Sequence, residues 1–207
     1  RISTIHNFRC PQCGMVFVGN RPTNEELGEA YGTLDHQQYY AEIRETNAAK
    51  MRECVLELEQ IVSSDAKILD VGCGNGEFLL LLKANGFRHL AGHEIPGADL
   101  SALTRAGIRI WQDYDYETLP DNSFDCVTML DVAEHVPSPR HLFDNCLRIL
   151  RPAGLLYVHT PGVSMLDRVM HHLGPVGRKW QRSRTSIFHL QNYSQTSVRL
   201  LLRDFAD

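Results

Sequence analysis

Three alternating glycines follow directly after a short apolar run, in residues 70–76 with the sequence DVGCGNG. Glycine lets the backbone turn tightly and approach a ligand closely. A helical pattern begins at Glu77, and the first turn of a helix presents N–H groups that have no partner within the helix. The segment therefore predicts a ligand-binding loop between a strand and a helix, with Gly72, Gly74 and Gly76 at the ligand.

Charge and spacing discriminate among three ligands for this loop. A phosphate-binding P-loop ends in Gly-Lys-Ser or Gly-Lys-Thr, whereas this loop ends in Asn-Gly-Glu. The dinucleotide fingerprint is G-x-G-x-x-G, and Glu77 stands in the place of its third glycine. Asp70, just before the glycines, would also repel a pyrophosphate. These features favour a cationic ligand without phosphate, and the sulfonium and ammonium groups of S-adenosylmethionine fit that description.

Acidic residues also end the next two predicted strands. Glu94 ends the second core strand, which is predicted over 89–94. Folds of the dinucleotide-binding type place an acid at this position, where it accepts the ribose hydroxyls. Asp113 and Asp115 follow the third strand and are both candidates to accept the adenine amino group. Counting back from Leu119 favours Asp115, with Tyr116 beside it. Because the carboxyl ends of parallel strands share one edge of a sheet, we expect these acids to face one crevice.

The elements that must position these residues alternate between strand and helix from about residue 66 onward. Such alternation predicts an α/β fold with a parallel sheet that is covered on both faces. After residue 160 we expect a helix over 163–173, a basic loop over 174–186 and a helix over 194–205, with no further strand after that last helix. The expected core strands are 67–71, 89–94, 108–112, 124–130 and 155–160, and the expected core helices are 77–85, 98–106 and 139–150.

The first 65 residues follow a different pattern. Residues 10–18 have the pattern of a knuckle followed by a short strand, and residues 23–26 offer a capping box for a helix. A longer helical pattern covers residues 38–62. We therefore expect two domains, a knuckle and helical cap over 1–65 and a cofactor-binding domain over 66–207.

Five blocks in a fixed order, spread over residues 66–162, resemble the class I S-adenosylmethionine-dependent methyltransferases, specifically their small-molecule branch. The blocks are 70–76, Glu94, 119–127, 131–136 and 150–156. The resemblance implies a Rossmann-like doubly wound sheet with core strands in the order 3-2-1-4-5. It also implies two further strands that this sequence lacks, so we expect a domain truncated at its C-terminus. The cofactor contacts that we expect are Asp70, Gly72, Cys73 (through its backbone), Gly74, Gly76, Glu94, Ile95, Asp115, Tyr116 and Leu130.

Two histidines are candidates for catalysis. His135 follows the fourth predicted strand, and the resemblance places His189 near the pocket of the methyl acceptor. Methyl transfer from a sulfonium is an in-line displacement that needs alignment above all. A base with a pKa of about 6.5, such as histidine, helps when the acceptor is a hydroxyl. The alternative is that His135 only shapes its loop by bonding a backbone carbonyl.

Cys10 and Cys13 form the C-x-x-C pair of a zinc knuckle. Tetrahedral zinc needs four ligands, and the sequence holds no second pair of this spacing. Small methyltransferases that resemble this sequence carry N-terminal zinc ribbons. The resemblance therefore implies that Cys10 and Cys13 are one half of a ribbon that binds zinc. The alternative is a pair of reduced surface thiols.

The composition of the 207 residues excludes several classes of protein. A net charge of −4 argues against a binder that relies on electrostatic attraction to nucleic acid or membranes. No apolar run approaches the ~20 residues that span a bilayer. Of the six cysteines, four are scattered singly and only Cys10 and Cys13 form a spaced pair, which suits a reducing, cytoplasmic compartment. Basic residues between Asp167 and Ser186 suggest either a clamp for an anionic acceptor or a solvated loop.

We conclude that the sequence predicts a cytoplasmic methyltransferase. It would use S-adenosylmethionine to methylate an O, N or C atom of a small molecule. The alternative is a non-enzymatic protein with the same cofactor fold, which would use the zinc knuckle and the basic loop for protein or nucleic-acid contact.

Overall fold

The computed structural model describes residues 7–20, 23, 36–114, 116–163 and 189–203, with side chains from residue 47 onward in the long helix described below. The chain forms two compact units. The sheet unit comprises residues 32–130 and 144–158, and the terminal unit comprises residues 1–31, 131–143 and 159–207. The predicted domains 1–65 and 66–207 stay a prediction.

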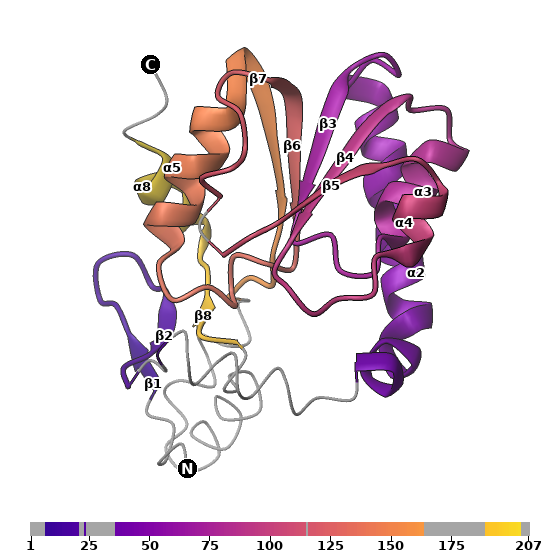
Figure 1. The fold of residues 1–207 in the computed structure, drawn as a ribbon. Coiled ribbons are helices and arrows are strands. Elements are labelled where there is room, and N and C mark those ends of the chain that lie inside the picture. Colours follow the sequence, from indigo (N-terminus) through magenta and orange to yellow (C-terminus); the bar gives the residue numbers. More distant parts are fainter. Residues whose placement is uncertain (1–6, 21–22, 24–35, 115, 164–188, 204–207) are drawn as a thin grey trace. The chain divides into compact units, whose positions relative to one another are not determined.

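The sheet unit is built on five strands in the order β5-β4-β3-β6-β7 (Figure 1). The central strand β3 pairs in parallel with β4 and with β6, and β4 pairs in parallel with β5. This order confirms the α/β fold and the predicted order 3-2-1-4-5. The strands are β3 (Lys67–Val71), β4 (His89–Glu94), β5 (Arg109–Gln112), β6 (Phe124–Leu130) and β7 (Leu150–His159).

The central strands form because they are almost continuously apolar. Ile68 and Leu69 of β3 and Val127 and Met129 of β6 are fully buried, as is typical of parallel strands that are covered on both faces. Helices α2 (His36–Ile61), α3 (Glu77–Ala84) and α4 (Ser101–Arg105) lie on one side of the sheet, and α5 (Pro139–Ile149) lies on the other (Figure 1).

Two of the core elements, β7 and α4, differ from the expected ranges by more than two residues. β7 begins at Leu150 and not at residue 155. The backbone turns locally within β7, since Ala153 has φ +63, and a Cβ at Gly154 would lie 2.9 Å from the carbonyl oxygen of Arg151. Helix α4 is shorter than expected and spans only Ser101–Arg105.

A pair of glycine substitutions tests the packing of the turn before α3. Gly76 has φ +86, and a Cβ there would overlap with the buried side chain of Leu103. We expect Gly76→Ala to lower the free energy of unfolding by about 3 kcal/mol, because left-handed backbone strain adds to overpacking. Gly86 has φ +92 with no atom within 4 Å of its Cβ position, so Gly86→Ala should cost only about 1 kcal/mol. Urea unfolding of both variants measures the difference, and equal losses would contradict the overlap.

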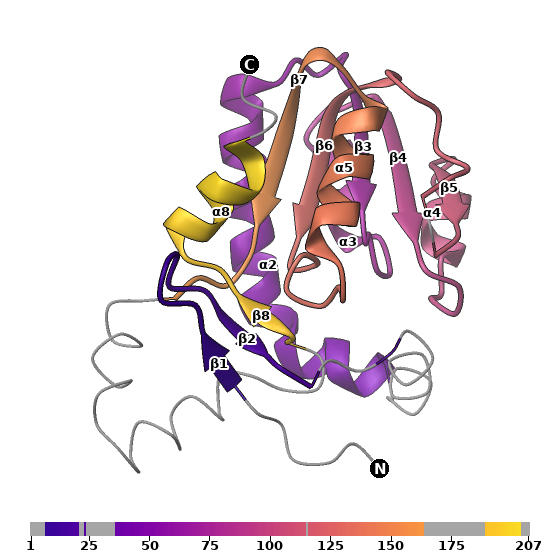
Figure 2. The same cartoon turned by 90° about the vertical axis from the view of Figure 1, so that its left-hand side faces the viewer.

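The terminal unit contains a second, antiparallel sheet in the order β1-β2-β8 (Figure 2). Its strands are β1 (Asn7–Arg9), β2 (Val16–Val18) and β8 (Gln191–Asn192). The sequence did not predict strand β8, which lies just before the last expected helix. A strand of two residues is too short to show an alternating hydrophobic pattern in the sequence. β8 is a strand only because Val16 and Phe17 pair with it.

Helix α8 (Gln195–Leu202) begins where the sequence predicted. Ser194 caps it, since the Ser194 Oγ accepts a hydrogen bond from the N–H of Ser197 at 3.0 Å, and Ser197 Oγ accepts one from the N–H of Ser194 at 2.9 Å. No helix within the described residues has both the length and the apolarity needed to cross a bilayer. The expected helix 163–173 and basic loop 174–186 lie almost entirely outside the described residues.

Candidate functional site

The glycine loop has the backbone that its sequence predicts. Gly72, Gly74 and Gly76 have φ values of 71, 55 and 86, in the left-handed region that only glycine enters at little cost. The N–H groups of Gly72 and Cys73 both donate to the carbonyl oxygen of His93, at 2.8 and 3.1 Å. The loop therefore continues from the end of β3 and is hydrogen-bonded to the end of β4, so these two strands hold it from both sides.

Glu94 connects the end of β4 with the middle of the loop. Its Oε2 accepts a hydrogen bond from the N–H of Gly74 at 2.7 Å, and its Oε1 accepts one from the N–H of Ile95 at 2.8 Å. Hydrogen bonds to a charged carboxylate are among the stronger ones in proteins. These two bonds fix the carboxylate beside the glycines, where the sequence predicted a ribose-binding acid.

Asp70 lies below the loop at the end of β3 and is only 2% exposed. Burial raises the pKa of this carboxyl to about 7; a hydrogen bond from Thr128 lowers it in part, and the charge of Glu94 raises it further. The hydroxyl of Thr128 donates to Asp70 Oδ1 at 2.7 Å. A buried carboxyl with such a pKa, beside a second carboxylate, is suited to face a positively charged group.

The other predicted cofactor contacts, Cys73, Ile95 and Leu130, differ in how exposed their side chains are. The thiol of Cys73 is buried against β4, since a Cβ at Gly92 would lie 2.8 Å from the Cys73 sulfur. The thiol therefore packs against β4, and a cofactor contact through the Cys73 backbone stays a prediction. Ile95 is exposed and Leu130 is half-buried at the end of β6.

Asp113 organises the segment that follows β5. Its Oδ1 lies 3.1 Å from Nε2 of the buried His93 and accepts the N–H of Tyr116 at 2.7 Å, and its Oδ2 accepts the Thr118 hydroxyl. Burial opposes ionisation of Asp113, but these hydrogen bonds hold its pKa below the ordinary value. Because its oxygens already hold the turn, Asp113 is a poor candidate for the adenine contact. Asp115, the predicted contact, lies outside the described residues.

The side chain of Tyr116 covers His93, with ring centroids 4.6 Å apart. Tyr116 has φ +61, which is unusual for an aromatic residue. Arg148 holds this turn from α5, because its guanidinium donates to the carbonyl oxygens of Tyr116 and Leu119 at 2.8 and 2.9 Å. Tyr116 is thus fixed beside the ends of β4 and β5.

In the terminal unit, the structure brings the two predicted catalytic histidines together. The rings of His135 and His189 are in edge-to-face contact with centroids 4.7 Å apart. Glu134 joins them: ligand atoms of Glu134, His135 and His189 all lie within 4.8 Å of one another. Two imidazoles and one carboxylate are a ligand set that binds transition metals.

The backbone around these residues is clamped by β8 and its neighbours. The amide of Gln191 donates to the carbonyl oxygens of Ala133 and Val136, at 2.7 and 2.8 Å. The hydroxyl of Tyr193 donates to Ala133 at 2.9 Å, and the N–H of Leu190 donates to the Glu134 carbonyl oxygen at 2.8 Å. Both Gln191 and Tyr193 are buried. The residues that bear the histidine pair are therefore rigidly connected to each other.

A second acidic residue and a third histidine lie in the same unit. Asp131 Oδ1 is 2.9 Å from His159 Nδ1, and the N–H of Asp131 donates to the His159 carbonyl oxygen at 2.8 Å. Asp131 has φ +54, so this pairing holds a non-glycine residue in a left-handed conformation. A carboxylate that binds one ring nitrogen fixes which side of the imidazole faces outward.

Cys10 and Cys13 form a tight knuckle. The N–H of Gly14 donates to the Cys10 carbonyl oxygen at 2.9 Å, and Gly14 has φ +75. Hydrogen bonds from the backbone at Cys13 and Gln12 lower the pKa of the Cys10 thiol, whereas burial raises that of Cys13. No third His, Cys or carboxylate of the described residues joins this pair. The zinc site at Cys10 and Cys13 stays a prediction.

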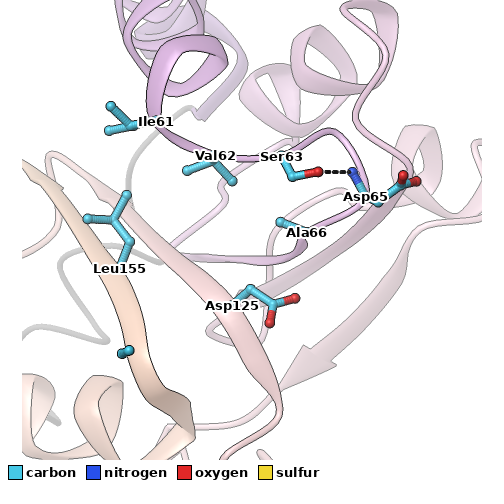
Figure 3. Close-up of a pocket in the computed structure, with 8 residues that line it drawn as sticks. Ile61, Val62, Ser63, Asp65, Ala66, Asp125 and Leu155 are labelled. Atoms are coloured by element: carbon cyan, nitrogen blue, oxygen red, sulfur yellow. Dashed lines mark hydrogen bonds between the residues drawn. The ribbon is translucent and has the colours of Figure 1, made fainter.

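A surface hollow of about 410 Å³ lies elsewhere on the sheet unit (Figure 3). It is lined by residues that include Ala66 and Asp125, at the amino ends of β3 and β6, and by Ile61 and Leu155. The glycine loop and Glu94 lie at the carboxyl ends of the strands. The hollow is therefore at the opposite edge of the sheet and belongs to a different region from the site.

Sequence reasoning missed several residues that support the site. His93, Thr128 and Arg148 bind predicted residues from within regular elements, where their polar side chains were not distinguished from surface ones. A histidine and a threonine inside strands that are otherwise apolar were the available signal, since buried polar groups need partners. Gln191 and Tyr193 gave no such signal.

Comparison with protein families gives a match over most of the chain. Residues 40–205 match a family described as a methyltransferase domain. Among curated proteins, the ubiquinone biosynthesis O-methyltransferase of Idiomarina loihiensis is 36% identical over 107 residues, which are 45% of this chain and 42% of that protein. The enzyme of the same name from Xylella fastidiosa strain 9a5c is 33% identical over 112 residues, 49% of this chain and 44% of that protein. The aligned region thus spans less than half of these relatives.

Solved structures share the fold at lower identity. A SAM-dependent methyltransferase of Thermotoga maritima superposes with a TM-score of 0.60 at 19% identity, covering 81% of this chain and 75% of that one. A SAM-dependent methyltransferase of Archaeoglobus fulgidus gives 0.56 at 20% identity, covering 81% and 74%. At such identities the likeness supports the fold alone.

Proposed function

Because this chain belongs to the methyltransferase domain family, we propose that it binds S-adenosylmethionine and transfers its methyl group to an O, N or C atom of a small molecule. The observation that carries the proposal is the Glu94 carboxylate, which is fixed beside the glycine loop by the N–H groups of Gly74 and Ile95. A second carboxyl, Asp70, lies at the same end of the sheet. This acidic surrounding suits a cationic cofactor and opposes a pyrophosphate.

The described residues fit S-adenosylmethionine, which supplies an electrophilic methyl group on a sulfonium when bound. Glu94 would accept the two ribose hydroxyls, as an acid in this position does in related folds. Gly72, Gly74 and Gly76 bring the backbone close to the methionine part, together with the backbone of Cys73 and the buried Asp70. Ile95, Leu130 and Tyr116 supply apolar surface beside the ribose and the adenine, and Asp115 is the proposed partner of the adenine amino group.

His135 and His189 are the proposed residues of the acceptor side. The rings touch each other, and Gln191 fixes the backbone beside one of them. Alignment of acceptor and methyl group supplies about 7–11 kcal/mol in well-oriented reactions. Rigid placement of the side chains that hold the acceptor is therefore the main contribution that this unit can make.

Calorimetric titration with S-adenosylhomocysteine, followed by transfer of a radiolabelled methyl group to fractionated metabolites, tests the proposal. We expect saturable binding and label in a small-molecule fraction. Label in protein or RNA fractions only would overturn the small-molecule acceptor, and no binding by the folded protein would overturn the cofactor.

We take the acceptor to be anionic, because the sequence between Asp167 and Ser186 is rich in arginine, which binds carboxylates and phosphates well. We place the enzyme in the cytoplasm, in line with its six free cysteines. Zinc at Cys10 and Cys13 would be structural. The fraction that receives label separates acceptors of different charge.

A further inference from the structure

A buried carboxylate oxygen in the terminal unit lacks a hydrogen-bond partner. Glu134 is fully buried, and its Oε2 accepts the hydroxyl of Thr160 at 2.8 Å. Its Oε1 makes no hydrogen bond in the part of the chain that the structure describes. A buried carboxylate oxygen without a partner is costly, so such an oxygen points to a ligand that the structure does not contain.

The position of that oxygen indicates what kind of ligand is missing. Glu134 Oε1 lies 4.0 Å from His135 Nε2, which is too far for a hydrogen bond. Two atoms that bind one zinc ion at about 2.1 Å stand at most about 4.2 Å apart. His189 offers a third ligand atom, and all three atoms lie within 4.8 Å of one another. Small side-chain rotations would therefore bring the three atoms onto one ion.

The surroundings make this a built site and not a chance cluster of surface residues. Leu190 and Gln191 both donate backbone N–H groups to the Glu134 carbonyl oxygen, at 2.8 and 3.3 Å. These bonds tie the segment that carries His189 to the one that carries Glu134 and His135. The ligand set is also selective, since thiolates are absent and two imidazoles with one carboxylate suit zinc, iron or manganese.

We propose that Glu134, His135 and His189 bind a divalent transition-metal ion, with zinc as the ion of choice, at a site distinct from the cysteine knuckle. A site with three protein ligands leaves coordination positions open for oxygen donors. A hydroxyl-bearing acceptor would bind at such a position, where the ion lowers the pKa of the hydroxyl. Only this use of the ion, and not its binding, rests on the proposed function.

Zinc content measures the site directly. The full chain carrying Cys10→Ser and Cys13→Ser, which removes the thiolate pair, is dialysed against Zn²⁺ and analysed by elemental mass spectrometry. We expect about one zinc ion per chain. Glu134→Gln, which keeps the shape of the side chain, and His189→Ala should each weaken binding at least 100-fold, because loss of an outer-shell partner alone costs about 10–100-fold. The matched control is His89→Gln, an exposed histidine of the sheet unit, which should bind as the parent does.

Two outcomes would overturn the site: no zinc in the folded parent, or undiminished binding by Glu134→Gln. If the cysteine variant does not fold, broadening of the Mn²⁺ resonance by the unsubstituted protein replaces zinc content, because Mn²⁺ prefers oxygen and nitrogen to thiolate ligands. Titration of the same samples with S-adenosylhomocysteine reports on the proposed function separately, since Glu94 and the glycine loop belong to the other unit.

Discussion

Glu94→Ala is expected to weaken the binding of S-adenosylhomocysteine about 100-fold or more, because hydrogen bonds to a charged group contribute about 1.5–3 kcal/mol each and the proposed contact has two. Glu94→Gln keeps one acceptor oxygen and should lose about tenfold. Comparing the two variants is informative because Glu94 also accepts hydrogen bonds from the N–H groups of Gly74 and Ile95, so the alanine variant loses these bonds together with the proposed ribose contact. Calorimetric titration of both variants measures the affinities.

The control for this series is Glu117→Ala, which removes an exposed carboxylate from the same unit. Its affinity should match that of the unsubstituted protein. Equal affinities for Glu94→Ala and the control would refute the ribose contact. If the alanine variant is weak because the loop has lost its anchor, its thermal unfolding midpoint without ligand will fall, whereas loss of ligand contacts alone leaves that midpoint unchanged.

Asp70→Asn is expected to abolish a pH dependence of stability. Burial raises the pKa of Asp70 in the folded protein to about 7, against 3.8 for a free carboxyl of this kind, so the folded state holds a proton that the unfolded chain has released. Stability from this group is present at low pH and is lost as pH rises toward 7. The total is about 4 kcal/mol, of which about 3 kcal/mol falls between pH 5 and pH 8.

Urea unfolding of the parent and of Asp70→Asn at about pH 4, pH 5 and pH 8 measures that loss. The variant should be more stable than the parent at pH 8 and similar near pH 4, because the asparagine amide oxygen still accepts the hydroxyl of Thr128. Asp65→Asn is the control, since Asp65 is exposed and pairs with Arg88 at the surface. Parallel pH profiles for the parent and Asp70→Asn would contradict a raised pKa.

The sheet could be predicted because its signals are local and strong. β3 and β6 are short apolar runs, and turn residues bound them, so both appeared at the residues that the structure gives. β8 could not be predicted, because a strand of two residues exists only through its pairing with β2. A boundary also differed at β7, which begins at Leu150 and not at residue 155 and contains Ala153 with φ +63.

The residues of the candidate site also fall into those that the sequence could predict and those that it could not. Glu94 and the glycines were predicted because their chemistry depends on the chain immediately around them. The contact between His135 and His189 depends on a segment far along the chain, and no spacing in the sequence encodes it. The sequence also could not predict that Asp113 holds the turn after β5, because both Asp113 and Asp115 follow that strand. Only the hydrogen bonds to His93, Tyr116 and Thr118 distinguish Asp113.

The antiparallel sheet of the terminal unit joins the two far ends of the chain, and this sets an order of assembly during synthesis. All five strands of the large sheet have been made once residue 159 leaves the ribosome, whereas β2 must wait for residues 191–192. Long-range pairings of this kind form late, because the intervening chain must first be closed into a loop. The growing chain can therefore complete the sheet that carries Glu94 before Gln191 and Tyr193, which bond the backbone beside His135, have been synthesised. A ribosome stalled between these points would display a cofactor-binding sheet without the histidine pair.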